Sequence, residues 1–153
     1  MMSNCTGGMV ILTGASSGIG LAMTKALLSN GYSVTGIARS FDAGVINSEN
    51  FEAVTLDLSE LDLLSKRLGE IISEISIPIR AVVHNAGVGK FASVEQLSVP
   101  DMKLVMETNF LSHAIVTKVF LPILKRQDTL ADIVFMGSES SIDGSRYGSI
   151  SCA

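Results

Sequence analysis

A glycine-rich stretch near the N-terminus constrains the fold of this chain most strongly. Residues 13–20 read TGASSGIG, after the apolar run MVIL and before an amphipathic segment. A strand, a glycine turn and a helix in this order point amide groups and the positive helix end at one place, which suits a pyrophosphate. A tight turn without a ligand is the open alternative. The predicted dinucleotide-binding residues are Thr13, Gly14, Ser16, Ser17, Gly18, Ile19 and Gly20.

The three glycines have different expected tasks. Gly14 permits the tight turn out of the strand, and Gly18 lets the backbone approach the pyrophosphate. Gly20 allows the helix to pack closely on the strand.

The size and composition indicate a single domain over residues 1–153. The chain is 47% hydrophobic and 17% charged, which suits one sizeable core. Its net charge of −4 and the lack of a basic run argue against a nucleic-acid or anionic-membrane surface. No apolar run approaches the roughly 18 residues that span a bilayer. We therefore expect a soluble, cytoplasmic protein with no membrane or nucleic-acid partner.

The cysteines and histidines show no metal-binding pattern. Cys5 and Cys152 lie near opposite ends without neighbouring ligands, so reduced thiols are favoured over a disulfide and no metal site is predicted. Structural roles are favoured for His84, beside a turn, and for His113, on a helix. Glu139 is interpreted as a solvated loop charge.

Short apolar runs alternate with helical patterns along the whole chain, as is typical of a parallel α/β sheet. Right-handed crossovers predict a Rossmann-like, doubly wound sheet with strand order 3-2-1-4-5. The ligand crevice then lies between strands one and four. The five strands are predicted over residues 8–13, 32–38, 52–56, 79–84 and 131–136.

Three helices are predicted between these strands. The first covers residues 18–30 and ends at the C-cap signal Asn30-Gly31. The second covers residues 59–75, with Ser59 and Asp62 in capping-box positions. The third covers residues 101–126 and is apolar on more than one face, with a kink expected at Pro122. The residues expected to be buried on the first helix are Ile19, Met23, Ala26 and Leu27.

Two positions at the same sheet edge suggest how the adenosine end of a dinucleotide is held. The second strand ends in Ala38-Arg39-Ser40 without a carboxylate, and an arginine there offers charge-assisted donors to a 2′-phosphate. NADP(H) is therefore favoured over NAD(H), with an ordinary loop cation as the alternative for Arg39. Asp57 either accepts from the adenine amino group or serves as a carboxylate near a helix N-terminus.

The end of the fourth strand completes the predicted crevice. Asn85, Ala86 and Gly87 form a small polar turn against which a cofactor can lie, although such a turn also occurs without a ligand.

Four motifs resemble the short-chain dehydrogenase/reductase family. They are TGxxxGIG at residues 13–20, NAG at residues 85–87, Asn109 on the third helix and Ser138 after the fifth strand. The resemblance covers the whole chain, which corresponds to the N-terminal part of a typical member, so we expect a fold truncated before the C-terminal strands. It implies an NADP(H)-dependent oxidoreductase that moves a hydride between nicotinamide and a small carbonyl or alcohol substrate.

The same resemblance implies a catalytic site built around Ser138 and Asn109. The serine would hydrogen-bond the substrate oxygen, and the asparagine would hold a water that links a lysine to solvent. From the residues alone, Ser138 is equally a plain loop residue and Asn109 a helix residue that needs a backbone partner. The family's Tyr-x-x-x-Lys is missing, because Tyr147 stands too near Ser138 and Ser151 occupies the expected tyrosine position.

Two alternatives to an active reductase follow from these departures. One is a catalytically inactive NADP(H)-binding fragment or sensor. The other is a different doubly wound binder, such as a methyltransferase or a flavodoxin-like receiver, against which Asn109 and Ser138 argue. We also expect the fifth strand to be an exposed apolar edge, which together with the helix at 101–126 offers a surface for homo-oligomers or self-association.

Overall fold

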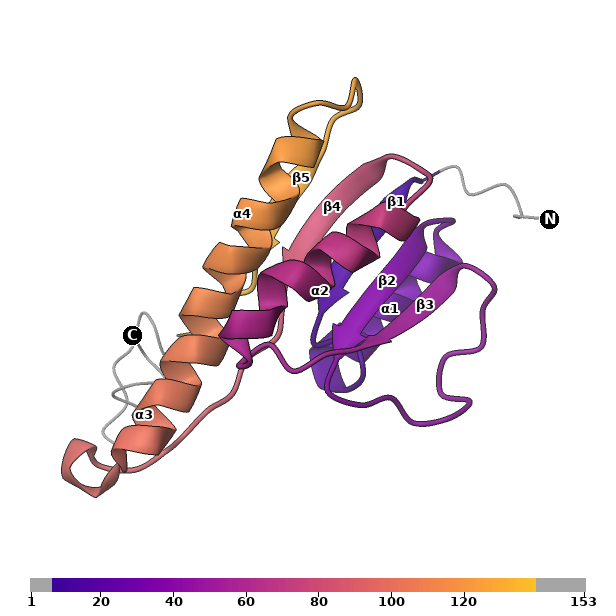
Figure 1. The fold of residues 1–153 in the computed structure, drawn as a ribbon. Coiled ribbons are helices and arrows are strands. Elements are labelled where there is room, and N and C mark those ends of the chain that lie inside the picture. Colours follow the sequence, from indigo (N-terminus) through magenta and orange to yellow (C-terminus); the bar gives the residue numbers. More distant parts are fainter. Residues whose placement is uncertain (1–6, 140–153) are drawn as a thin grey trace.

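The computed structural model describes residues 7–139 as one five-stranded sheet between helices (Figure 1). The strand order β3-β2-β1-β4-β5, with every neighbouring pair parallel, confirms the predicted order. Each strand lies within one residue of its predicted bounds, because short apolar runs between turn signals mark buried parallel strands clearly. The strands are β1 Met9–Thr13, β2 Ser33–Ala38, β3 Phe51–Thr55, β4 Ile79–His84 and β5 Asp132–Phe135.

Helices cover the two faces of the sheet unequally. Two of them, α2 and α4, pack side by side over one face, and α1 covers β1 and β2 on the other (Figure 1). Alternate residues of β1 serve the two cores: Ile11 packs with Phe120 on the α2–α4 side, and Val10 packs on the α1 side. The helices are α1 Gly18–Ser29, α2 Leu61–Glu74, α3 Val99–Met106 and α4 Ser112–Leu124, with the short turns η1 Val94–Gln96 and η2 Glu107–Leu111.

The buried face of α1 differs from the predicted one. Ile19 is 65% exposed and Ala26 is exposed. The face is rotated because Gly20 packs against the glycine turn, which directs Ile19 away from the sheet. The predicted C-cap is confirmed, since Gly31 has a φ of 79°. The α1 residues that are buried or packed on the sheet are Gly20, Met23, Thr24, Leu27 and Leu28.

The predicted capping box at the start of α2 is wrong. The helix begins at Leu61, and its N-cap Glu60 makes no side-chain capping bond. Ser59 Oγ instead donates to Asp57 Oδ1 at 2.8 Å, and the same oxygen accepts from the Ser59 amide at 2.9 Å. The local turn closed by Asp57 therefore takes the hydroxyl that the capping box needed.

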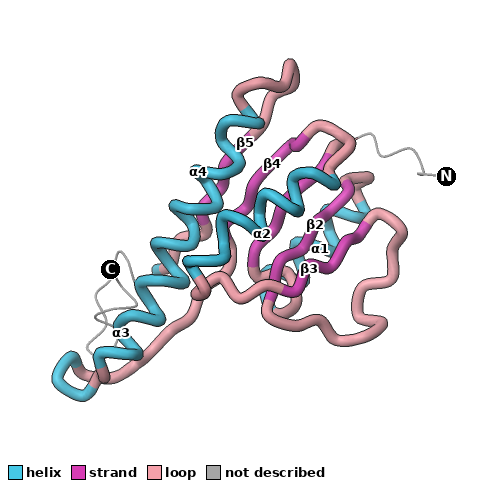
Figure 2. The backbone as a smooth tube through the Cα atoms, in the orientation of Figure 1, coloured by secondary structure: helices cyan, strands magenta, loops and turns pink. Residues whose placement is uncertain are grey.

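The third predicted helix is a continuous helical rod of three parts, α3, η2 and α4 (Figure 2). It starts at Val99, earlier than predicted, because Ser98 caps it by accepting from the Asp101 amide at 3.2 Å. The middle part, η2, is a single π-helical turn. Pro122 lies in the last turn of α4. The rod is apolar on more than one face: Val105, Val116 and Phe120 are buried, and Met106, Phe110 and Leu111 are exposed.

Among residues 7–139, the β5 edge is apolar and exposed, as predicted. Val134, Phe135 and Met136 are 38%, 58% and 42% exposed. The strand is the last in the sheet, and α1 packs on β1 and β2 instead. Within the described residues, none of the helices is long and apolar enough to cross a bilayer.

Candidate functional site

A crevice of about 510 Å³ lies at the carboxyl ends of β1, β2 and β4, where the strand order changes direction. This is the switch point at which open α/β sheets bind ligands. Thr13 and Gly18 are not among its lining residues. The predicted residues that line it are Gly14, Ser16, Ser17, Ile19, Gly20, Arg39, Asp57, Asn85, Ala86 and Gly87.

Two glycines of the turn occupy places where no larger side chain fits. Gly14 has a φ of 69°, and a Cβ there would lie 2.9 Å from Ala86 Cα. A Cβ on Gly20 would lie only 1.9 Å from the Gly14 carbonyl oxygen. Gly18 has a φ of 51° but open space around it. Close packing therefore demands glycine at positions 14 and 20, whereas backbone conformation favours it at 18.

Thr13 holds the two halves of the crevice together from behind. Its Oγ1 accepts from the amides of Asn85 and Ala86, both at 3.0 Å. In return, Asn85 Nδ2 donates to the carbonyls of Thr13 and Gly14, both at 3.2 Å. The turn after β4 is thus pinned to the turn after β1, which fixes the spacing of the walls on which a cofactor would lie.

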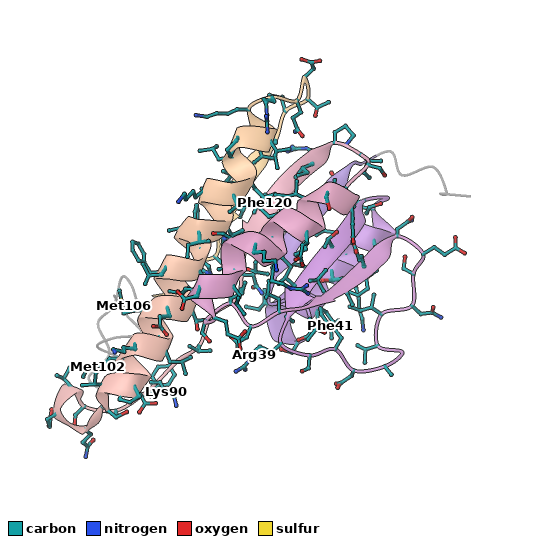
Figure 3. The ribbon with its side chains drawn as sticks, viewed as in Figure 1. Arg39, Phe41, Lys90, Met102, Met106 and Phe120 are labelled. Atoms are coloured by element: carbon teal, nitrogen blue, oxygen red, sulfur yellow. The ribbon has the colours of Figure 1, made fainter. Side chains whose placement is uncertain are left out.

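Charged residues line the adenosine end that the sequence predicts. Arg39 is exposed and lines the crevice beside Ser40; Figure 3 shows it with Phe41 beside one end of the sheet. Asp57 lines the same crevice, although its Oδ1 already accepts two bonds from Ser59. Asp42 is a further lining carboxylate, which the sequence analysis missed because it lies in a loop without a motif.

Both ends of the Asn109 side-chain amide bond to one backbone residue. Its Oδ1 accepts from the Val88 amide at 2.8 Å, and its Nδ2 donates to the Val88 carbonyl at 2.9 Å. This supplies the backbone partner that a buried asparagine needs. Asn109 lies in the π turn η2, and Val88 lines the crevice, so the side chain ties the rod to the crevice wall.

Two crevice residues on the rod were not predicted. Leu104 and Thr108 line the crevice one helical turn apart. Their i, i+4 spacing next to Asn109 is the signal that a helical-face analysis would have used.

Ser138 follows the carboxyl end of β5, at the end of the sheet where the crevice also lies. The Met136 amide donates to the His84 carbonyl at 2.9 Å, which carries the pairing of β4 and β5 past the strand end. Ser138 is exposed and is not among the residues that line the crevice. Tyr147 and Ser151 lie outside the described residues.

Two histidines lie behind the turn at residues 85–87. His84 is completely buried and stacks on Phe135, with ring centroids 4.4 Å apart. The His113 ring lies 5.0 Å from that of His84, and its Nε2 is 2.9 Å from the Ala86 carbonyl oxygen. Burial and the neighbouring His113 lower the pKa of His84 to about 4, and burial lowers the pKa of His113. Both rings are therefore neutral at pH 7.

Sequence comparison agrees with this geometry. The family model described as short chain dehydrogenase matches residues 8–153. The chain belongs to this family. A probable short-chain type dehydrogenase/reductase from Helicobacter pylori is 34% identical over 123 residues, which cover 78% of this chain and 44% of that protein. The chain thus spans less than half the length of this relative.

Solved structures share the fold. A 3-oxoacyl-[acyl-carrier protein] reductase from Brucella melitensis superposes with a TM-score of 0.85 at 21% identity, over 96% of this chain and 63% of that one. The structure titled ElxO with NADP bound superposes with a TM-score of 0.81 at 22% identity, over 93% of this chain and 60% of that one. At this level of identity the likeness establishes the Rossmann-like architecture of this chain.

Proposed function

We propose that this chain forms the cofactor-binding part of an NADP(H)-dependent oxidoreductase that interconverts small carbonyl and alcohol compounds. The observation that carries the proposal is the crevice whose floor has no room for a Cβ at Gly14 or Gly20. The glycine backbone that lines this crevice and the start of α1 at Gly18 suit a pyrophosphate, because amide groups and the positive end of a helix N-terminus favour an anion. The proposed holders are the turn 13–20 for the pyrophosphate and the turn 85–87 for the rest of the cofactor.

Preference for NADP(H) rests on the charges at the adenosine end. Arg39 lines the crevice directly after β2, and a guanidinium provides planar, charge-assisted donors to a phosphate. Asp42 and Asp57 also line this end. One oxygen of Asp57 is already occupied by Ser59. We infer that the 2′-phosphate lies nearest to Arg39.

When bound, nicotinamide supplies or accepts the hydride. For Ser138 we propose a hydrogen bond from its hydroxyl to the substrate oxygen. Asn109 fixes Val88 in the crevice wall, and the water-holding role that the resemblance implies stays a prediction. Cofactor binding is the step of the proposal that these 153 residues test, because they contain no Tyr-x-x-x-Lys.

Charge reversal at Arg39 tests the cofactor preference. We expect Arg39→Asp to weaken NADPH binding by about 30-fold or more, because a carboxylate repels the 2′-phosphate, and to change NADH binding by less than about threefold. Fluorescence titration with both nucleotides measures the two affinities. Lys25→Asp, an equal charge change on an exposed α1 residue outside the crevice lining, is the matched control. Equal losses for NADPH and NADH would remove Arg39 from the proposal.

Two further expectations stay predictions. Self-association through the β5 edge and the α3–α4 rod is supported by the exposed apolar side chains there, and sedimentation velocity at several concentrations tests it. The cytoplasmic location is tested by cell fractionation.

A further inference from the structure

The carbonyl of Ala86 is held from the side opposite to the glycine turn. The backbone amides of Asn85 and Ala86 bond to Thr13 of β1, whereas the Ala86 carbonyl oxygen lies 2.9 Å from His113 Nε2 on α4. Ala86 and its neighbours line the crevice. The turn that would contact a cofactor is therefore clamped between β1 and the imidazole of His113.

The partner determines which nitrogen of His113 carries the hydrogen. A carbonyl oxygen only accepts, so Nε2 must be the donor in this contact. The burial that lowers the pKa of His113 keeps the ring neutral at pH 7. In that form Nε2–H is the ring's one donor, and it is used on Ala86.

His84 holds the His113 ring in place. It is fully buried on β4, its Nε2 lies 2.9 Å from Thr117 Oγ1, and its Nδ1 has no partner. The two histidine rings lie 5.0 Å apart, and Phe135 stacks on His84 at 4.4 Å and lies 6.3 Å from the His113 ring. His84 Nδ1 is buried without a partner, so a charge on His84 disfavours the packed arrangement, and burial also disfavours a charge on His113.

We propose that His113 is a positioning residue for the dinucleotide: packed beside His84 and neutral, it fixes the Ala86 carbonyl and with it the cofactor-contacting turn at residues 85–87. The inference rests on the proposed function, because it assigns a task toward the cofactor of that same crevice. A role of His113 also makes the affinity for the dinucleotide depend on pH, which the glycine turn alone does not.

The consequence of protonation follows from the groups that face the pair. His84 on β4 and His113 on α4 face each other, β5 contributes the uncharged Phe135, and the turn contributes the Ala86 carbonyl dipole. Burial outweighs the opposing effect of the Ala86 hydrogen bond on the pKa of His113, so a charged, half-buried ring gains by turning toward solvent, away from the buried His84. The turn then loses its support, and affinity for the dinucleotide falls as the pH is lowered through the pKa of His113, which burial holds below its ordinary value.

The experiment compares wild type, His113→Leu and His113→Gln by NADH titration at pH 7.5 and 5.0. NADH is the probe because it lacks the 2′-phosphate, whose own titration would confuse the profile. Leucine removes the donor, whereas the glutamine amide carries a donor at a reach similar to that of Nε2. We expect His113→Leu to bind about 5- to 10-fold more weakly at pH 7.5, the loss of one hydrogen bond, and His113→Gln to bind within about twofold of wild type.

The pH profile separates positioning from simple packing. Wild type should weaken about 5- to 10-fold between pH 7.5 and 5.0, while both variants should stay flat within about twofold. Circular dichroism at each pH checks that the chains remain folded. If His113→Leu does not fold, His113→Gln decides alone, since it must match wild type at pH 7.5 and lack the loss at pH 5.0.

Three results overturn the inference. Equal affinity of wild type and His113→Leu at pH 7.5 removes the positioning role. A loss at pH 5.0 that persists in His113→Gln assigns the titration to another group. Absence of NADH and NADPH binding in all three proteins overturns the proposed function together with this inference, and so is distinguishable from the first two results.

Discussion

The strands β1 and β5 are alike in sequence and unlike in surroundings. Both are short apolar strands that end at the same edge of the sheet and lead into a glycine. Ile11 of β1 is fully buried, whereas Phe135 of β5 is 58% exposed. A Cβ on Gly14, after β1, would lie 2.9 Å from Ala86 Cα, whereas a Cβ on Gly137, after β5, would meet nothing within 4 Å. The difference arises from position, since β1 is central and β5 is the last strand. The crevice therefore lies at the tightly packed centre of the sheet, whereas Ser138 follows β5, the exposed outermost strand of the sheet.

The largest expected effect comes from filling the space at the first of these glycines. Gly14→Val should abolish NADPH binding, a loss of more than about 100-fold, because its Cβ meets Ala86 and valine strains at positive φ. Gly137→Val, the matched change after β5, should leave binding within about twofold, because a Cβ there meets nothing within 4 Å. Isothermal titration calorimetry measures both. If Gly14→Val bound normally, the contrast between the two strand ends would have no functional meaning.

Truncation of one apolar residue in each strand should give unequal losses of stability. Ile11→Ala should lower the free energy of unfolding by about 3–4 kcal/mol, because it leaves a cavity in the sheet core. Phe135→Ala should cost about 1 kcal/mol, because over half of its surface is already in water. Urea denaturation gives both values. Similar losses would mean that β5 is covered in solution.

Acid should destabilise the fold through His84, which lies buried on β4 against Phe135 of β5. The pKa of His84 falls from 6.5 in the unfolded chain to about 4 in the fold, so the unfolded state binds more protons between these values. Stability is then fully present above about pH 6.5 and decreases as the pH falls toward 4, by on the order of 2 kcal/mol at pH 4.5. Denaturation of wild type and His84→Asn across this range measures the effect. An unchanged pH dependence in the variant would contradict it.

The smallest effects are expected at two side-chain amides that bond the backbone before and after β4. Asn109 bonds the amide and carbonyl of Val88, and Gln127 bonds those of Ile79 at the other end. Replacing either by leucine should cost about 1–2 kcal/mol of stability. Only Asn109→Leu should weaken NADPH binding, by about three- to fivefold, because Val88 lines the crevice and Ile79 does not. Equal affinities of the two variants for NADPH would show that Asn109 does not support the binding site.

The sequence predicts the parts of the molecule that local chemistry determines. Strand order follows from the alternation of apolar runs and helices, and Gly14 and Gly20 are recognisable because only glycine fits their places. The turn at residues 85–87 is recognisable for a similar reason, since small residues follow a buried strand. These features lie in the centre of the sheet.

Features set by competition between neighbours were not predicted. Ser59 satisfies the capping pattern, yet its hydroxyl donates to Asp57 and does not cap the helix. The exposure of Ile19 depends on how Gly20 packs against the Gly14 carbonyl, which no periodicity reveals. The π turn that carries Asn109 interrupts a helix whose residues would all continue an α-helix. Asp42 reaches the crevice from a loop without a motif.

Above all, we propose that the crevice on the packed centre of the sheet binds a nicotinamide dinucleotide phosphate. Isothermal titration of NADPH and of NADH into the 153-residue chain at pH 7.5 tests it most directly. We predict one site per chain, with NADPH bound at least about tenfold more tightly than NADH because Arg39 meets the 2′-phosphate. No heat of binding with either nucleotide, in a chain that circular dichroism shows to be folded, would contradict the account.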